Sequence, residues 1–126
     1  MPTILLTDDQ VSCSEIIWHT LRELGCEMLY VEEKSEVLTR LPQVQPDLII
    51  TDLGSPGVDG FTFIQRVRAH NESIPILVVS GIIDDDQNRA RALRLGANHC
   101  LGKPFDCDEL REVVRSVLLD CGGQTP

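Results

Sequence analysis

Three short runs of the sequence are almost entirely aliphatic: residues 3–7 (TILLT), 47–51 (DLIIT) and 74–80 (IPILVVS). Short runs without alternating polar residues are typical of strands that are covered on both faces, as in a parallel sheet. Two weaker runs, 26–31 and 98–102, are candidates for further strands. These runs restrict the chain to folds in which a central sheet is enclosed by other elements.

Amphipathic patterns separate the aliphatic runs. They predict helices over residues 11–24, 33–41, 60–70, 84–95 and 106–120. Strand and helix alternate five times with short connections, which favours right-handed crossovers and a parallel sheet. We therefore predict an α/β fold: a five-stranded parallel sheet with helices on both faces. The domain should cover residues 1–120, with 121–126 as a tail or the start of a linker.

Size and charge narrow the class of protein. The length, 126 residues, suits one domain with a single sizeable core. A formal net charge of -9 disfavours binding to nucleic acid or to an anionic membrane, because both require a positive face. No apolar run is long enough to span a bilayer, and no basic-then-apolar leader begins the chain, so a cytoplasmic location is expected. The five cysteines include no C-x-x-C pair and are interpreted as packing thiols.

Polar residues follow four of the predicted strands. In parallel α/β sheets, binding sites form beyond the carboxyl ends of the strands. Asp8 and Asp9 follow the first strand, Asp52 the third, Ser80 ends the fourth, and Lys103 follows the fifth. Three acids, one hydroxyl and one ammonium should therefore converge at one edge of the sheet.

These residue types point to phosphoryl chemistry. Adjacent carboxylates raise the cost of ionising one another unless a cation lies between them, and their hard oxygens favour Mg2+ or Mn2+. Asp52 could act as a nucleophile that becomes an aspartyl phosphate, with Ser80 and Lys103 holding phosphate oxygens. Any one of these residues alone is more often a helix cap, a turn former or a solvated charge. Their coincidence at four strand ends favours the functional interpretation.

The motifs that carry these residues resemble a known family. They are "DD" after the first strand, "D" after the third with "SPGVDG" behind it, "SG" after the fourth, and "KPF" after the fifth. With these motifs the chain resembles, over essentially its whole length, the receiver domain of bacterial two-component response regulators. The resemblance implies a flavodoxin-like fold with strand order 2-1-3-4-5.

The resemblance also implies roles. Asp52 would accept a phosphoryl group from a phosphohistidine of a sensor histidine kinase or a histidine phosphotransfer protein. Asp9 would bind Mg2+ directly and Asp8 partly through water, while Asp52 and the backbone carbonyl of Gly54 would complete the protein ligands. The Lys103–Pro104 bond would be cis. Such a domain works in phosphorelay signalling, is no turnover enzyme, and passes its signal to an effector through the fourth helix, fifth strand and fifth helix.

One position departs from the family pattern. The family usually carries Tyr or Phe three residues before the lysine, where this chain has Cys100. A thiol does not fill the volume of a ring, so the switch that begins at Ser80 either runs through loop motion alone or has a different output.

Other functions remain as alternatives. One is a receiver-fold interaction module that is never phosphorylated. An aspartate-nucleophile phosphatase of the haloacid dehalogenase type would need a second acid where Gly54 stands. A flavodoxin-type carrier would not place two acids in its phosphate loop.

Overall fold

The computed structural model describes residues 2–8, 11–53 and 59–122 of the chain. The strands are β1 (Thr3–Thr7), β2 (Glu27–Tyr30), β3 (Leu48–Thr51), β4 (Ile76–Ser80) and β5 (His99–Gly102). The helices are α1 (Val11–Arg22), α2 (Lys34–Val44), α3 (Gly60–His70), α4 (Asp86–Leu95) and α5 (Cys107–Gly122), and a 3-10 helix, η1 (Gly81–Asp84), precedes α4.

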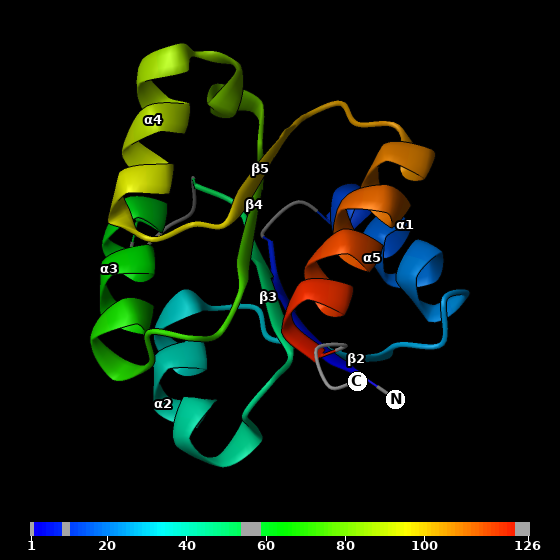
Figure 1. Ribbon diagram of the computed structural model, residues 1–126, viewed down its shortest axis with the longest axis horizontal. Coiled ribbons are helices and arrows are strands. Elements are labelled where there is room, and N and C mark those ends of the chain that lie inside the picture. Colours follow the sequence, from blue (N-terminus) through cyan, green and yellow to red (C-terminus); the bar gives the residue numbers. More distant parts are fainter. Residues whose placement is uncertain (1, 9–10, 54–58, 123–126) are drawn as a thin grey trace.

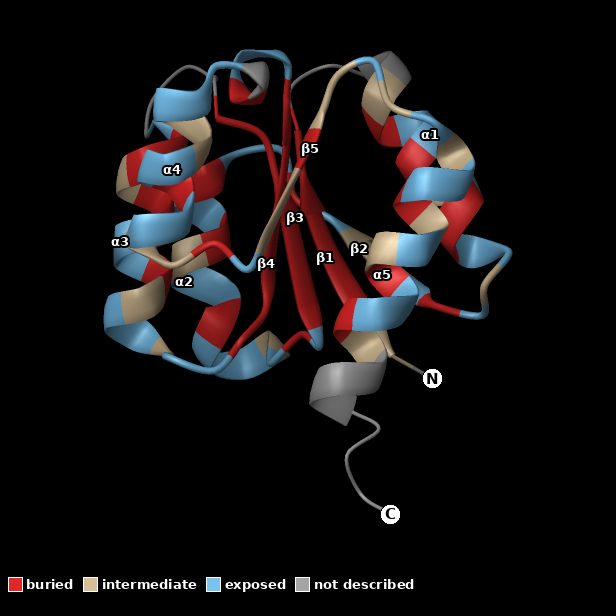
Figure 2. Cartoon of the chain, turned by 45° about the horizontal axis from the view of Figure 1, so that its top comes forward, coloured by how far each residue is buried: buried red, intermediate tan, exposed pale blue. Residues whose placement is uncertain are grey.

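The strands form a five-stranded parallel sheet in the order β2-β1-β3-β4-β5, as the resemblance implied. Helices α1 and α5 cover one face of this sheet, and α2, α3 and α4 cover the other (Figure 1). The central strands β1, β3 and β4 are buried between the two helical layers, whereas the edge strands β2 and β5 are only partly buried (Figure 2). The predicted α/β architecture is confirmed.

Each aliphatic run supplies both faces of the sheet because successive side chains of a strand point in opposite directions. Leu5 packs in the core beneath α2, α3 and α4, while its neighbours Ile4 and Leu6 pack beneath α1 and α5. All three side chains are fully buried. This explains why the runs carry no polar alternation.

The predicted bounds of four helices differ from the observed ones. Helix α1 was predicted to end at residue 24 but ends at Arg22, ahead of the turn that leads to Gly25. Helix α2 was predicted to end at residue 41 but continues through Pro42 to Val44, and it ends where Gln45 adopts the left-handed conformation and its N–H donates to the Leu41 carbonyl oxygen. The helix predicted over 84–95 begins later, at Asp86, because the Asp85 side chain accepts a hydrogen bond from the Gln87 N–H and caps it. Helix α5 extends to Gly122, two residues beyond its predicted end. Within the described ranges, no helix is long and apolar enough to cross a membrane.

Helix α3 begins at a well-formed cap. One carboxylate oxygen of Asp59 accepts a hydrogen bond from the Thr62 N–H at 3.0 Å, and the other accepts one from the Thr62 hydroxyl at 2.9 Å. The backbone hydrogen bond from Thr62 is the main cause that lowers the pKa of Asp59 below its ordinary value of 3.8. The ionised cap therefore stabilises the folded chain above that ordinary value, and its contribution is lost as the pH falls through the lowered pKa.

Replacing Asp59 with alanine should lower the free energy of unfolding by about 1 kcal/mol near neutral pH, because one N–H of the first turn loses its acceptor. Urea unfolding followed by circular dichroism should show the difference from the unmodified chain shrinking as the pH falls below the ordinary pKa of Asp. Asp59→Asn keeps an acceptor and is the control, with a stability near that of the unmodified chain. A difference that stays constant down to strongly acidic pH would contradict the capping role.

Candidate functional site

The register of the central strands brings Asp8 and Asp52 to the same edge of the sheet. Thr7 of β1 is paired with Thr51 of β3, and the two acids are the next residues of their chains. Adjacent strands lie about 4.8 Å apart, so the two acids begin from neighbouring backbone positions. Asp8 is 1% exposed and Asp52 is 2% exposed, so both carboxylates are removed from solvent. The hydroxyl of Tyr30, at the end of β2, donates to the Asp8 carbonyl oxygen at 2.9 Å.

Lys103 reaches this edge from the other side of the sheet. It follows β5, which β4 and β3 separate from β1 in the sheet, and its side chain nevertheless contacts Asp8. Its Nζ lies 2.9 Å from Oδ2 of Asp8, and the side chain is largely buried. The Lys103–Pro104 peptide is cis, as the resemblance implied. The predicted approach of the lysine to the acidic end of β1 is therefore present.

A second lysine, which the sequence reasoning did not place at the site, contacts the central acid. Lys34 is the first residue of α2 and is 3% exposed. Its Nζ forms an ion pair with Oδ1 of Asp52. Two buried carboxylates thus face two ammonium groups. The signal that could have found Lys34 was its position three and seven residues before Val37 and Leu41, which places all three on the buried face of α2.

Ser80 closes β4 and begins the next turn. It is buried, and its hydroxyl oxygen accepts a hydrogen bond from the Ile82 N–H at 3.4 Å. Its carbonyl oxygen accepts one from the Lys103 N–H at 3.3 Å, which ties the end of β4 to the segment that carries the lysine. A hydroxyl can accept and donate at once, so this arrangement is compatible with donation to a phosphate oxygen.

Cys100 is half-buried in β5 and packs against the core beneath α4. Burial raises the pKa of its thiol, and the charge of Arg89 partly opposes that effect. Nη1 of Arg89 donates to the Cys100 carbonyl oxygen at 3.3 Å, which links α4 to β5. A protonated thiol fits this partly buried place as a small apolar group.

Two of the four predicted metal ligands, Asp9 and Gly54, lie outside the described residues. Among the residues that the structure does describe, no group of three or more Asp, Glu, His or Cys side chains could hold a metal ion. Asp8 and Asp52 supply two buried hard-oxygen donors, which is the ligand type that Mg2+ and Mn2+ prefer. These two residues fit such an ion as part of a larger ligand set.

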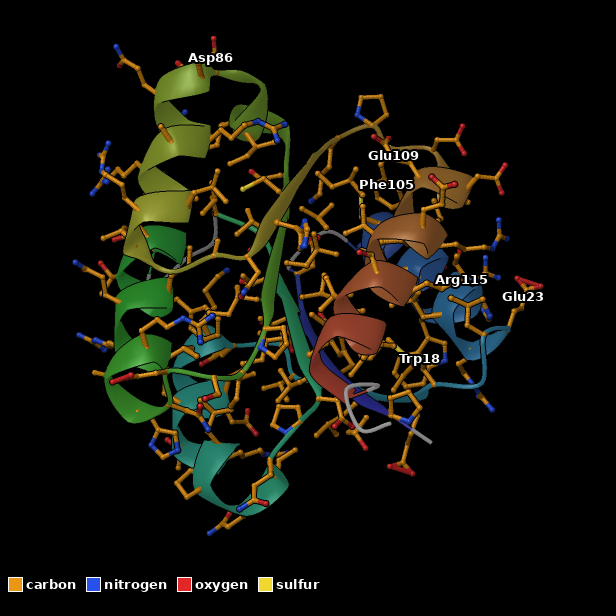
Figure 3. The ribbon with its side chains drawn as sticks, viewed as in Figure 1. Trp18, Glu23, Asp86, Phe105, Glu109 and Arg115 are labelled. Atoms are coloured by element: carbon orange, nitrogen blue, oxygen red, sulfur yellow. The ribbon has the colours of Figure 1, made fainter. Side chains whose placement is uncertain are left out.

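The surface beside the site is formed by two helix ends. Asp86 at the start of α4, and Phe105 and Glu109 near the start of α5, lie toward the end of the molecule where the strands have their carboxyl ends (Figure 3). Helix α4 carries exposed Leu93 and a row of charged residues, whereas only Ala92 is fully buried among its residues whose burial is described.

A family model described as "Response regulator receiver domain" matches residues 4–115 of this chain. Among curated relatives, the DNA-binding dual master transcriptional regulator RpaA of Synechocystis sp. is 34% identical over 120 residues, which are 94% of this chain and 49% of the relative. Sporulation initiation phosphotransferase F of Bacillus subtilis is 27% identical over 91% of this chain and 92% of its own length. The chain spans about half the length of the first curated relatives it matches.

Solved structures agree with the family model. A putative response regulator from Chloroflexus aurantiacus has a TM-score of 0.87 and 33% identity, with 93% of this chain and 97% of that chain covered. The chemotaxis response regulator CheY4 of Vibrio cholerae has a TM-score of 0.85 and 28% identity, over 94% and 99% of the two chains. With its strand order and the acids and lysine at its strand ends, this chain belongs to the family of response regulator receiver domains, the signalling modules of two-component systems.

Proposed function

We propose that this chain is a phosphorylatable receiver domain in which Asp52 accepts a phosphoryl group from a phosphohistidine. The donor is a sensor histidine kinase or a histidine phosphotransfer protein. The observation that carries the proposal is the pairing of Thr7 with Thr51, which sets buried Asp8 and Asp52 side by side while Lys103 contacts Asp8. Burying two carboxylates and two ammonium groups at one edge is costly, and a site that binds a cation and a phosphoryl group explains why they are placed there.

The transfer step is a nucleophilic displacement at phosphorus. A carboxylate oxygen of Asp52 attacks the phosphorus atom as the bond between phosphorus and the donor imidazole breaks, and the imidazole nitrogen keeps the electron pair of that bond. Asp8, Asp9, Asp52 and the Gly54 carbonyl would hold Mg2+ or Mn2+, which supplies charge neutralisation for the phosphoryl oxygens. Lys103 supplies a further positive charge and Ser80 a hydrogen-bond donor. In this proposal the domain catalyses only its own phosphorylation and dephosphorylation.

Two surfaces suit the two partners of such a domain. On α1, Ile16 is exposed, and an open pocket nearby is lined by Trp18 and Tyr30. Because Tyr30 contacts the backbone of Asp8, this surface adjoins the acceptor site and suits the phosphoryl donor. The surface of α4, β5 and α5 suits an effector, because β5 carries Cys100 and leads into Lys103.

The test is phosphoryl uptake. The purified chain is incubated with acetyl phosphate and Mg2+, and its intact mass is measured. We expect one phosphate adduct, which Asp52→Asn abolishes. Asp59→Asn, which neutralises an exposed acid seven residues further along the chain, is the matched control and should keep the adduct.

A second candidate function is favoured by one specific contact. The ion pair between Lys34 and Asp52 already neutralises the acceptor carboxylate. A receiver-fold interaction module that is never phosphorylated would retain such a pair. No adduct on the unmodified chain, with acetyl phosphate or with a phosphorylated donor protein, would favour that candidate over phosphoryl transfer.

A further inference from the structure

Lys34 occupies a place that is unfavourable for an ammonium group. It is 3% exposed, and transferring an ammonium from water into a protein interior is strongly unfavourable unless an opposite charge compensates. It is also the first residue of α2, where the positive end of the helix dipole disfavours a cation. Its N-cap residue, Glu33, forms no side-chain cap hydrogen bond that would offset this.

The compensation comes from Asp52. Nζ of Lys34 forms an ion pair with Oδ1 of that carboxylate, which is itself 2% exposed. Burial on the same face of α2 as Val37 and Leu41 holds the lysine side chain toward the sheet. The position of Lys34 is thus explained by the acceptor carboxylate rather than by the stability of the helix.

This contact changes the balance of charge at the acceptor. Asp8 has Lys103 within ion-pair distance, and Asp52 has Lys34. A divalent cation that uses the same two carboxylates must share them with these ammonium groups or displace one of them. A unit charge and a divalent charge a few ångströms apart in a buried site repel each other strongly unless the site rearranges.

We propose that Lys34 is a built-in competitor cation that weakens divalent metal binding at Asp52 in the unphosphorylated chain. The inference rests on the metal site of the proposed function and adds a residue of this chain that regulates it. Lys34 acts on the metal through Asp52 and is therefore a positioning residue. The fraction of the chain that holds a metal ion then depends on whether the ion pair between Lys34 and Asp52 is kept.

The experiment measures metal binding without phosphorylation. Mn2+ is titrated into the chain, and the free ion is quantified by electron paramagnetic resonance. Lys34→Gln removes the charge and retains a hydrogen-bond donor for Asp52, so it should bind Mn2+ about ten-fold more tightly than the unmodified chain. Arg40→Gln is the matched control, since it removes the same charge from an exposed position of the same helix, and its affinity should stay within about two-fold.

Two further variants separate charge from shape and locate the effect. Lys34→Arg keeps the positive charge and should keep the weak affinity of the unmodified chain. In a chain that already carries Asp52→Asn, Lys34→Gln should no longer tighten binding, because its effect passes through that carboxylate. Circular dichroism melting confirms that each variant is folded, and Lys34→Met provides a second neutral variant if the glutamine fails to fold.

The inference is overturned if Lys34→Gln and Lys34→Met bind Mn2+ no more tightly than the unmodified chain, or if Lys34→Arg tightens binding as much as they do. The outcomes are separable from those of the proposed function. Tighter Mn2+ binding without any phosphate adduct leaves the inference standing and removes the phosphorylation proposal. A phosphate adduct with unchanged Mn2+ binding does the reverse.

Discussion

Replacing Gly60 with alanine should lower the free energy of unfolding by about 3 kcal/mol, although the same change inside most helices is stabilising. The reason is the close approach of α3 to the end of β3. A Cβ atom at Gly60 would lie 2.4 Å from the Leu53 Cα and 2.8 Å from the Asp52 carbonyl oxygen. Both are backbone atoms, so no side-chain rotation relieves the contact.

The same contact connects α3 to the acceptor residue. The Gly60 N–H donates to the Leu53 carbonyl oxygen at 3.0 Å, which fixes the first turn of α3 against the segment that follows Asp52. An added methyl group must push that segment away. We therefore expect Gly60→Ala to slow phosphoryl uptake as well as to destabilise the fold.

Urea denaturation monitored by circular dichroism measures the stability effect. Gly81→Ala is the matched control, because an added Cβ there would have nothing within 4 Å. That control should be neutral or slightly stabilising, by about 0.5 kcal/mol. A Gly60→Ala variant as stable as the control would show that the end of β3 can move away from α3 without loss.

The sheet could be predicted because its three central strands are buried on both faces. A run such as residues 3–7, aliphatic at every central position, has few other places to lie in a chain of this size. The rule that sites form at the carboxyl ends of parallel strands then correctly predicted that Asp8, Asp52 and Lys103 lie at one edge of the sheet. The contact between Lys103 and Asp8, across the ends of two intervening strands, follows from that rule.

Lys34 was missed because the rule was applied to four strands and not to β2. A lysine at the start of a polar helix is usually solvated, and which way it faces depends on how the helix is rotated about its axis. In α2 that rotation is set by the burial of Val37 and Leu41, which turns Lys34 toward Asp52. The sequence alone offered the helical spacing, but it did not show that α2 packs where Lys34 meets Asp52, the residue that follows β3.

Some helix boundaries depend on single capping side chains, which the apolar periodicity of the sequence does not reveal. Residues 84–95 look like one continuous helix, yet the chain forms the 3-10 turn η1 and restarts where Asp85 caps α4. The turn matters for the site because it begins at Ser80, whose hydroxyl accepts from the Ile82 N–H. Local capping, rather than the apolar pattern, decides how the end of β4 presents that hydroxyl.

Replacing Lys103 with methionine should slow phosphoryl uptake from acetyl phosphate by about a hundred-fold, the effect of removing one preorganised charge from a transferring group. Nζ of Lys103 lies 2.9 Å from Asp8 Oδ2 in a largely buried site, where a charge is screened less than at the surface. Methionine retains the length and apolar stem of the side chain and removes only the ammonium group. The rate of uptake is followed by intact mass in the presence of Mg2+.

The matched control for this variant is Arg111→Met on α5. Arg111 forms ion pairs with Asp108 and Glu23 that are open to solvent, so its removal lowers the net charge equally but leaves the acceptor site intact. Uptake by this control should equal that of the unmodified chain. Lys103→Arg should fall between the two, because a guanidinium keeps the charge but does not reproduce the compact ammonium beside Asp8. If Lys103→Met takes up phosphate as fast as Arg111→Met, the ammonium at the end of β5 serves only to neutralise Asp8, and phosphoryl transfer does not depend on it.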